Sequence, residues 1–413
     1  MDPRDDVQDA VVLASDAATR LRARLNVPEG RALRLAFQAG PGDAVGTFEQ
    51  WATGCHDARV PVLSYSGQFY SLVAALGAEA LVLTETPEQP DRPDPRICFR
   101  HVPRARSARG VAWHFAEHDY ARRLATAIAD WGPDAIILGG DLKPAAYHAM
   151  TRTAPFFLTL HSTFWPMGKR PRDLRSRARQ WRLGRALAQA AGAVCTSREC
   201  ARQFDTLAGP GQMREVEMPQ IRAGHLYPLR RRSRARQVLF LGRIEVNKGV
   251  FDLVTAFGAL AAQFADARLV LAGTGSAAAA LADLVARHPA RGQIEIAGQL
   301  DAEGVHAALD AADLLVCPTR SEFAEGLALV VLEAVAQGVP ALASSVVPAA
   351  ETAGAACMTF PADDTDALQA MLRQLMTDDA AYAARACDVA RIRARMLDRS
   401  LGWGSCLARV LAG

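Results

Sequence analysis

Short apolar runs that end at glycine, proline or aspartate recur along the first half of the chain. Several are continuous rather than alternating, which is typical of strands covered on both faces of a parallel sheet. Alanine-rich stretches with helical spacing fall between them, as in residues 120–131 and 181–191, and residues 5–25 predict a leading helix. The predicted strands are residues 33–36, 60–63, 80–83, 135–138, 156–160 and 191–195.

A second series of strands and helices follows a segment that is poor in apolar residues. Residues 222–236 hold Pro228 and several arginines, so we expect a linker between two domains there. The later strands are predicted over residues 237–241, 267–272, 294–297, 314–317, 339–343 and 357–360, with helices such as 251–264 and 327–337 between them. This alternation predicts two α/β, Rossmann-like domains, with a ligand outside the carboxyl ends of the strands in the cleft between them.

The composition is that of an ordinary globular protein with two or three domains. Of 413 residues, 50% are hydrophobic and 22% are charged, which excludes a disordered or fibrous chain. Lys and Arg number 47 against 44 Asp and Glu, so the formal net charge is only +3. We therefore expect no nucleic acid partner, because the global field that would hold one is absent.

The cysteines and the N-terminal residues favour a cytoplasmic protein. The 8 cysteines are scattered with no C-x-x-C pair, so they predict no zinc site and suit a reducing compartment as small buried side chains. The first residues show no positive region followed by an apolar one, and no stretch approaches the roughly 18 apolar residues of a membrane span. We expect a location that is cytoplasmic, at most peripheral to a membrane.

The loop after the predicted strand 237–241 carries two cations beside glycines. Gly242 would let the backbone approach a ligand at the end of the strand. Arg243 and Lys248 offer a planar fork and a point charge suited to a diphosphate. Two solvated cations in a polar loop are the alternative, and the loop alone leaves both interpretations open.

Two carboxylates bracket an almost wholly apolar run further along the chain. Glu325 precedes the run and Glu333 lies inside it, so we expect Glu325 at the N-terminus of a buried helix, where the dipole and the free amides favour anions. A carboxylate inside an apolar helix is costly to desolvate unless it is paired or bonded to a ligand. Glu333 is therefore a candidate binding residue. The alternatives are a helix cap at Glu325 and a structural carboxylate at Glu333.

With these motifs in order, the chain resembles the retaining glycosyltransferases of family 4, which have the GT-B fold of two Rossmann-like domains facing each other across a cleft. Glu325 and Glu333 match that family's Glu-x7-Glu motif. The other matching segments are Gly242-Arg243, Lys248-Gly249, Ala272-Gly273-Thr274-Gly275, Gly298, Ala334 and Gly338-Val339-Pro340. The resemblance implies an acceptor domain over residues 1–225, a donor domain over 237–387, and a helical segment 388–413 that packs back on the first domain.

The resemblance implies the transfer of a sugar from a UDP- or GDP-linked donor, with retention and with no metal or other cofactor. Arg243 and Lys248 would bind the diphosphate and stabilise the charge that develops on it. Glu325 would contact the transferred sugar and Glu333 the ribose hydroxyls, so neither is assigned the acid or nucleophile role of a glycosidase pair. Further contacts with the nucleotide sugar are implied for Gly42, Gly46, Gly242, Gly273, Gly298, Gly326 and Leu327.

The first half of the chain resembles the family less closely. Residues 40–47 occupy the place of a glycine-rich loop that faces the diphosphate, with a ligand-free turn as the alternative. His161 follows the strand 156–160 where the family commonly has a histidine near the donor sugar and acceptor, and we expect a catalytic role for it; a histidine at a strand end is otherwise usually a satisfied polar residue. Asp141 and Lys143 follow another strand and could contact the acceptor.

Two positions depart from the family pattern. Ala328 stands where the family often has glycine, and Val346-Val347 fall where many members carry a Gly-Gly pair before the residue matched by Glu351. Either change could narrow the donor pocket. Together they keep open a nucleotide-binding pseudoglycosyltransferase.

Residues 169–185 are strongly basic and have aromatic neighbours. The cations are Lys169, Arg170, Arg172, Arg175, Arg177, Arg179, Arg182 and Arg185, opposed by Asp173 alone. With Phe164, Trp165 and Trp181 beside them, they suit an anionic membrane surface or a pyrophosphate-linked lipid acceptor. A solvated basic helix is the alternative.

These observations and the resemblance predict a glycosyltransferase that acts on a saccharide or lipid-linked acceptor in bacterial surface polysaccharide or glycolipid synthesis. A GT-B nucleotide-sugar epimerase or hydrolase is the alternative from another enzyme class. It would keep the diphosphate site but need no acceptor surface. Product analysis with the donor alone separates the two.

Overall fold

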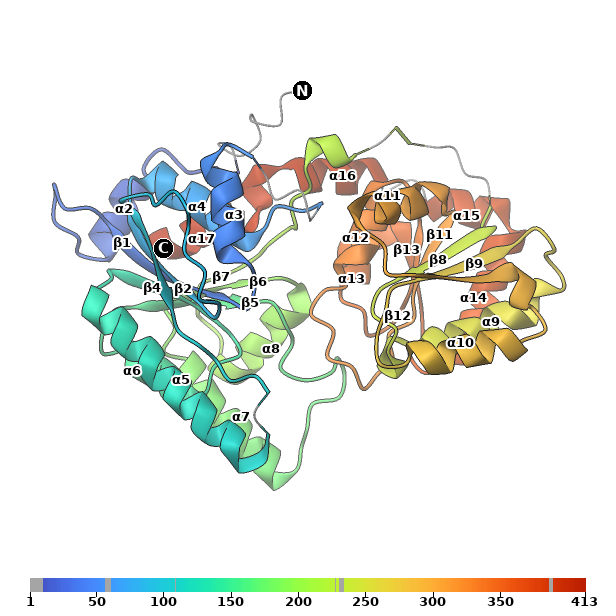
Figure 1. Ribbon diagram of the computed structural model, residues 1–413, viewed down its shortest axis with the longest axis horizontal. Coiled ribbons are helices and arrows are strands. Elements are labelled where there is room, and N and C mark those ends of the chain that lie inside the picture. The colour runs from blue at the N-terminus through green and yellow to red at the C-terminus, as the bar shows by residue number, and fades with distance from the viewer. Residues whose placement is uncertain (1–9, 56–60, 108, 227, 230–233, 386–388) are drawn as a thin grey trace. The chain divides into compact units, whose positions relative to one another are not determined.

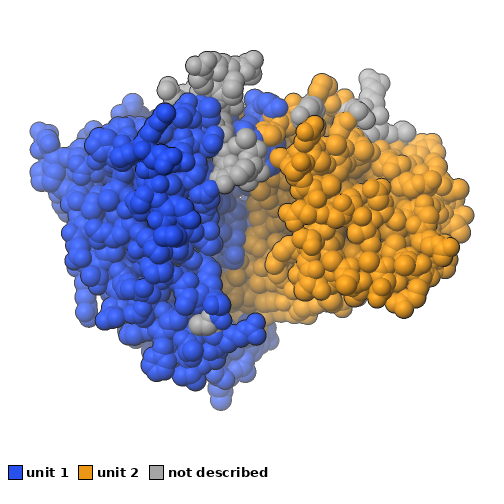
Figure 2. All heavy atoms as spheres, viewed as in Figure 1, with its two compact units in different colours: residues 1–162, 171–224, 398–413 blue, residues 163–170, 225–397 orange. Residues whose placement is uncertain are grey.

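The computed structural model describes residues 10–55, 61–107, 109–226, 228–229, 234–385 and 389–413 (Figure 1). The chain divides into two compact units (Figure 2). The first unit holds residues 1–162, 171–224 and 398–413, and the second holds 163–170 and 225–397. The predicted linker and leading helix lie partly outside the described residues.

The first unit is built on a seven-stranded sheet in which every neighbouring pair is parallel. Its strand order is β3-β2-β1-β4-β5-β6-β7. The strands are β1 (Arg34–Gly40), β2 (Glu79–Thr84), β3 (Ile97–His101), β4 (Ala135–Gly139), β5 (Phe156–Leu160), β6 (Gly192–Cys195) and β7 (Arg214–Val216). The prediction of a strand over residues 60–63 was wrong for the described part of that segment, because Val62 makes only an isolated antiparallel bridge with Ile221.

Helices cover both faces of this sheet (Figure 1). One layer consists of α2 (Ala17–Arg24), α3 (Ala44–Ala52), α4 (Tyr65–Leu76) and α17 (Trp403–Ala412). The other consists of α5 (Gly110–Trp131), α6 (Pro144–Met150), α7 (Leu174–Leu187) and α8 (Arg198–Ala208). Trp403 is fully buried and its ring lies 5.8 Å from that of Phe37. The last helix therefore contributes this aromatic side chain to the core between the first layer and the sheet.

The second unit contains a six-stranded parallel sheet of order β10-β9-β8-β11-β12-β13. Its strands are β8 (Gln237–Leu241), β9 (Arg268–Ala272), β10 (Ile294–Gly298), β11 (Leu314–Cys317), β12 (Ala341–Ser344) and β13 (Cys357–Phe360). Its helices are α9 (Val250–Ala261), α10 (Ala278–Arg287), α11 (Ala302–Ala311), α12 (Leu329–Ala336), α13 (Ala349–Ala353), α14 (Thr365–Thr377), α15 (Asp379–Arg385) and α16 (Val389–Leu397). Both units are therefore Rossmann-like, as predicted.

The strand orders locate the two places where a ligand is expected. In each sheet the order reverses beside the first strand, between β1 and β4 in the first unit and between β8 and β11 in the second. Loops at the carboxyl ends of two such strands diverge and leave a crevice, which is where open α/β sheets bind ligands. No described helix is long and apolar enough to cross a membrane.

Candidate functional site

The crevice of the second unit is flanked by the two loops that sequence analysis singled out. The loop after β8 carries Arg243 and Lys248, and the loop after β11 carries Glu325. The chain separates Lys248 from Glu325 by 77 residues, yet Lys248 Nζ lies 2.5 Å from Glu325 Oε2. The switch point of the sheet thus brings together the predicted phosphate cation and the predicted sugar-binding carboxylate.

Glu325 is held from several sides. Only 9% of the residue is exposed. The Thr319 hydroxyl donates to Glu325 Oε2 at 3.3 Å, and the Thr163 hydroxyl donates to the Glu325 carbonyl at 3.4 Å. A carboxylate fixed by a cation and a hydroxyl on one oxygen has a defined orientation and keeps its other oxygen for a further donor.

An aromatic ring supports the two cations. Lys248 Nζ lies 4.0 Å from the ring centroid of Phe323, and the guanidinium carbon of Arg243 lies 5.7 Å from the same centroid. A ring face attracts both cations at this range. The Arg243 side chain makes no ion pair with another described residue, so its charge is available to an anion. Sequence analysis missed Thr319, which bonds to Glu325 within one loop, and Phe323, whose role depends on contacts across the switch point.

Two of the signature glycines are required by close backbone contact. Gly273 has φ +134°, and a Cβ there would lie 1.8 Å from the Gly242 carbonyl oxygen. Gly249 has φ +70°, and a Cβ there would lie 1.9 Å from the Pro318 oxygen. Any side chain would push these loops apart. The glycines therefore pack the loops after β8, β9 and β11 together, whether or not they also contact a ligand.

The segment between the two motif carboxylates differs from the prediction. Helix α12 begins at Leu329, so Glu325 lies four residues before it in irregular backbone. The cap position is Ala328, with no side-chain cap hydrogen bond, so the alternative of a helix cap at Glu325 is wrong. The amide of Leu327 donates no hydrogen bond to another described residue, which leaves it available beside Glu325.

Ala328 adopts a left-handed backbone, with φ +66° and ψ +66°. An L-residue with a Cβ pays roughly 1 kcal/mol in this region, whereas glycine does not. The departure from glycine noticed in the sequence therefore has a conformational cost. The strain falls on the link between Glu325 and α12.

We expect Ala328→Gly to stabilise the protein by about 1 kcal/mol, because it relieves that backbone strain. Thermal unfolding of the two proteins, followed by circular dichroism, measures the difference. Ala334→Gly in the interior of α12 is the matched control, and it should destabilise the protein by a similar amount. A loss of stability on Ala328→Gly would contradict the assigned strain.

Glu333 is the second motif carboxylate and lies on the fifth residue of α12. It is half-buried, and its side chain makes no hydrogen bond or ion pair with another described residue. Burial alone raises the pKa of Glu333 to about 7. A carboxyl group desolvated without a protein partner is costly. Hydrogen-bond donors from a ligand would offset that cost.

The other predicted residues of the second unit are loop glycines and a valine pair. Gly298 ends β10 with φ +70°, and its carbonyl accepts a 2.7 Å hydrogen bond from the Gly273 amide. Val346 and Val347 are buried after β12, and neither has a positive φ. The backbone conformation at the valine pair therefore does not require glycine. Gly326 lies between Glu325 and Leu327 in the irregular segment.

In the first unit, the glycine-rich loop joins the carboxyl end of β1 to helix α3. The carboxylate of Asp43 caps α3 by accepting a 2.7 Å hydrogen bond from the Gly46 amide. A Cβ on Gly46 would lie 2.4 Å from that carboxylate. Packing around the helix cap therefore explains the glycine at position 46 without a ligand. Gly42 is exposed, and a Cβ there would meet no other atom.

His161 directly follows β5 and is exposed to solvent. Its Nε2 lies 2.8 Å from the Thr159 hydroxyl, and its ring lies 4.2 Å from that of Tyr65. Partial desolvation by the neighbouring protein lowers the pKa of His161, against an opposing effect of Asp141. The imidazole is therefore neutral at pH 7.

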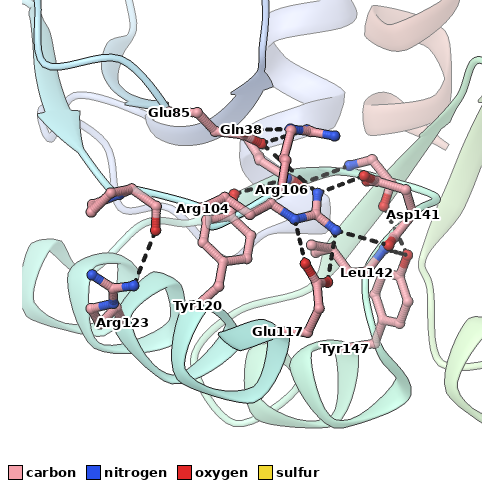
Figure 3. A network of polar contacts seen from close by, with 12 residues as sticks. Gln38, Glu85, Arg104, Arg106, Glu117, Tyr120, Arg123, Asp141, Leu142 and Tyr147 are labelled. Carbon is pink, nitrogen blue, oxygen red and sulfur yellow. Dashed lines mark hydrogen bonds and ion pairs between the residues drawn. The ribbon is translucent and has the colours of Figure 1, made fainter. Parts of the chain in front are cut away.

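Asp141 follows β4 at the switch point of the first sheet and belongs to a network of ion pairs (Figure 3). The Arg104 guanidinium donates to both oxygens of Glu117, at 2.9 and 2.8 Å, and to Asp141 at 2.6 Å. Arg106 makes a two-point contact with Glu85 at 2.6 and 2.7 Å. Arg104 is 6% exposed at its side chain and so fixes Asp141 from inside the unit.

The network leaves Asp141 accessible, because 55% of its side chain is exposed. Lys143, two residues on, lies over the ring of Trp113, with Nζ 3.5 Å from the centroid. Burial lowers the pKa of Lys143. These two residues stay candidates for acceptor contact. In the described part of the chain, no three His, Cys, Asp or Glu side chains gather so as to hold a metal ion.

Comparisons with known proteins match both halves of the chain. Residues 228–391 match the family described as "Glycosyl transferases group 1", and residues 62–216 match the "Glycosyl transferase 4-like domain". Glycogen synthase of Mycobacterium tuberculosis is 27% identical over 272 residues, or 62% of this chain. The match spans 63% of the length of that relative.

Solved structures show the same fold at low sequence identity. Sucrose-phosphate synthase from Thermosynechococcus elongatus superposes with a TM-score of 0.64 at 17% identity, over 91% of this chain and 97% of its own. HepE from Anabaena, in complex with UDP, gives 0.62 at 13% identity, over 89% and 96%. At these identities the likeness establishes the fold alone.

Proposed function

We propose that this chain, a glycosyltransferase whose two halves match the group 1 and the 4-like family models on a GT-B fold, transfers a sugar from a nucleoside-diphosphate sugar to a saccharide or lipid-linked acceptor, with retention. The observation that carries the proposal is the Lys248–Glu325 pair at the switch point of the second sheet. In this proposal Lys248 is the cation for a leaving diphosphate, and Glu325 is the carboxylate for the sugar attached to it.

The charges at this crevice suit a diphosphate leaving group. Arg243 is exposed and makes no ion pair with another described residue, and Lys248 is 16% exposed at its side chain. As the glycosidic bond breaks, negative charge grows on the diphosphate, and preorganised cations in a partly desolvated site stabilise that charge. In this proposal the departing phosphate also helps to deprotonate the acceptor, so Glu325 acts by binding sugar hydroxyls.

The nucleoside end is assigned to Glu333 and the loop after β10. Burial raises the pKa of Glu333, and hydrogen bonds from the two hydroxyl groups of a ribose would stabilise its ionised form. HepE is known in complex with UDP, and we propose UDP or GDP as the leaving group here. Surface polysaccharide or glycolipid assembly is the proposed process.

Calorimetric titration with UDP, GDP and ADP, with and without EDTA, tests the donor site. Binding of one nucleotide, unchanged by the chelator, would support a diphosphate site made of protein cations. Incubation of the matching nucleotide sugar with and without candidate acceptors then separates transfer from epimerisation or hydrolysis. Failure of all three nucleotides to bind would favour a pocket closed around Ala328 and the valine pair.

We further propose that α7 contacts an anionic membrane that carries the acceptor. Leu174 and Trp181 expose 83% and 61% of their surface on this helix. Its arginines are exposed and make no ion pair with other described residues, although Arg185 packs over the Trp181 ring at 5.1 Å. Exposed apolar side chains among unpaired cations favour insertion at a charged interface.

We expect Leu174→Ser/Trp181→Ala to weaken binding to vesicles that contain phosphatidylglycerol by about tenfold or more, because two apolar anchors are lost. Co-sedimentation measures the bound fraction. Val12→Ser, which replaces another exposed apolar residue of this unit, is the control and should bind normally. Equal binding of the double variant and the parent would contradict the contact.

A further inference from the structure

The His161 ring is the end of a hydrogen-bonded chain that starts in the C-terminal helix. The Trp403 indole Nε1 donates to the Thr159 hydroxyl at 2.9 Å, and that hydroxyl lies 2.8 Å from His161 Nε2. Trp403 and Thr159 are 0% and 2% exposed. The chain is therefore sealed from water on one side and ends at an exposed imidazole.

The available hydrogen atoms determine which group donates in the bond between Thr159 and His161. An indole N–H is a donor only, so the Trp403 bond occupies an acceptor position of Thr159 Oγ1. The hydroxyl proton of Thr159 then needs an acceptor, since buried polar hydrogens are paired. Among the described residues, His161 Nε2 is the acceptor within reach.

We infer that Thr159 and Trp403 hold His161 as the neutral tautomer with its proton on Nδ1, so that the ring presents an N–H donor to a bound ligand. Nδ1 has no partner in the part of the chain that the structure describes. Thr159 and Trp403 are positioning residues in this assignment. The ligand group is an oxygen acceptor such as a sugar hydroxyl, an identification that rests on the proposed function.

The groups around the ring favour its neutral form. The ring of Tyr65 covers it at 4.2 Å, and the Tyr65 hydroxyl donates to the buried Glu217 at 2.7 Å instead of to the imidazole. The surroundings lower the pKa of His161, and Asp141 is the charged group that opposes this. A neutral ring whose Nε2 already accepts a proton is unsuited to general-base catalysis through that atom.

Nitrogen NMR of the full-length protein tests the assignment directly. Long-range proton–nitrogen correlations of a sample labelled with ¹⁵N-histidine distinguish protonated from unprotonated ring nitrogens, and His161→Gln identifies the His161 signals among the 9 histidines. We expect Nδ1 to carry the proton at pH 7. A proton on Nε2 in the unliganded protein would overturn the inference and leave the proposed glycosyl transfer untouched.

Variants of Thr159 separate positioning from folding. Thr159→Ser keeps the hydroxyl and should keep the Nδ1–H tautomer. Thr159→Val keeps the shape and removes the donor, so the tautomer signal should shift toward Nε2–H, with kcat/KM about 3- to 10-fold lower. An unchanged tautomer in a folded Thr159→Val would overturn the inference. If that variant fails to fold, Thr159→Ser and the parent spectrum still decide.

The position of the donor on the ring gives a second comparison. Asparagine carries its amide nitrogen as many bonds from Cα as Nδ1 lies, whereas glutamine carries it as far as Nε2. His161→Asn should therefore retain several-fold more activity than His161→Gln. The reverse order of activity would contradict a donor at Nδ1, whichever acceptor is used in the assay.

Discussion

Lys248→Met is expected to lower kcat by about 100- to 1,000-fold, because it removes a fixed cation from the diphosphate at the moment its charge grows. Methionine keeps the length and apolar stem of lysine, so packing against Phe323 is retained. Steady-state kinetics with the donor identified by titration measure the loss. Turnover within about threefold of the parent would contradict the assigned role.

The same substitution also breaks an ion pair, and the structure predicts that this second effect can be separated from the first. Without Lys248, the Thr319 hydroxyl is the one partner that Glu325 Oε2 keeps among the described residues. Leaving a buried charge unpaired costs on the order of 3 kcal/mol. Lys248→Met/Glu325→Gln replaces the charge by a neutral amide, so it should recover much of the thermal stability while turnover stays low.

A control away from the crevice completes the experiment. Arg287 lies exposed at the end of α10, and Arg287→Met should change neither turnover nor stability measurably. If Lys248→Met and the double variant lose stability equally, the Lys248–Glu325 pair does not hold Glu325. Recovery of turnover in the double variant would show that the unpaired carboxylate, not the missing cation, had inhibited transfer.

The two sheets show which parts of the fold can be predicted from sequence. All six strands of the second sheet were predicted: the central ones give continuous apolar runs because both of their faces are covered, and the partly exposed edge strands β10 and β13 still carry enough apolar residues to be recognised. In the first sheet, the edge strands β3 and β7 were missed. Burial alternates along β3, and the three residues of β7 are largely exposed, so neither gives such a run.

The sequence pointed to some single residues of the candidate site but not to their arrangement. Loop composition pointed to Lys248, and an apolar run to Glu325, yet their contact depends on strand order. The link from Thr159 to Trp403 spans 244 residues and leaves no local pattern. The positive φ of Ala328 is likewise a property of the folded loop. The sequence indicated it only indirectly, through an alanine where the family often has glycine.

Glu333→Gln is expected to weaken binding of the nucleotide sugar by about 10- to 100-fold at about pH 8, because hydrogen bonds from ribose hydroxyls to a charged carboxylate are lost. The nucleotide sugar is a better probe than the free diphosphate, since its phosphates are diesters that do not titrate near neutral pH. Calorimetry measures the affinity. The exposed Glu29→Gln in the first unit is the control and should bind like the parent.

The raised pKa adds a pH signature to this prediction. Burial places the pKa of Glu333 at about 7 in the folded protein, against an ordinary value of 4.5. Hydroxyl donors prefer the ionised form, so binding releases a proton, and affinity should rise by about tenfold or more as pH increases from about 5.5 to about 8. Glu333→Gln should give a flat profile over the same interval.

The stability of the ligand-free protein should change with pH in the opposite direction to its affinity. This difference distinguishes a lost ligand contact from a misfolded variant. A carboxyl group whose folded pKa exceeds its unfolded value stabilises the protein while it is protonated, and that contribution disappears as pH rises from about 4.5 through 7. Glu333→Gln should therefore raise the thermal unfolding temperature at about pH 8 and leave it nearly unchanged at about pH 4.5. A variant that binds donor poorly yet unfolds later would show that the carboxylate costs stability in order to hold the nucleoside. Poor binding together with earlier unfolding would instead assign Glu333 to the fold.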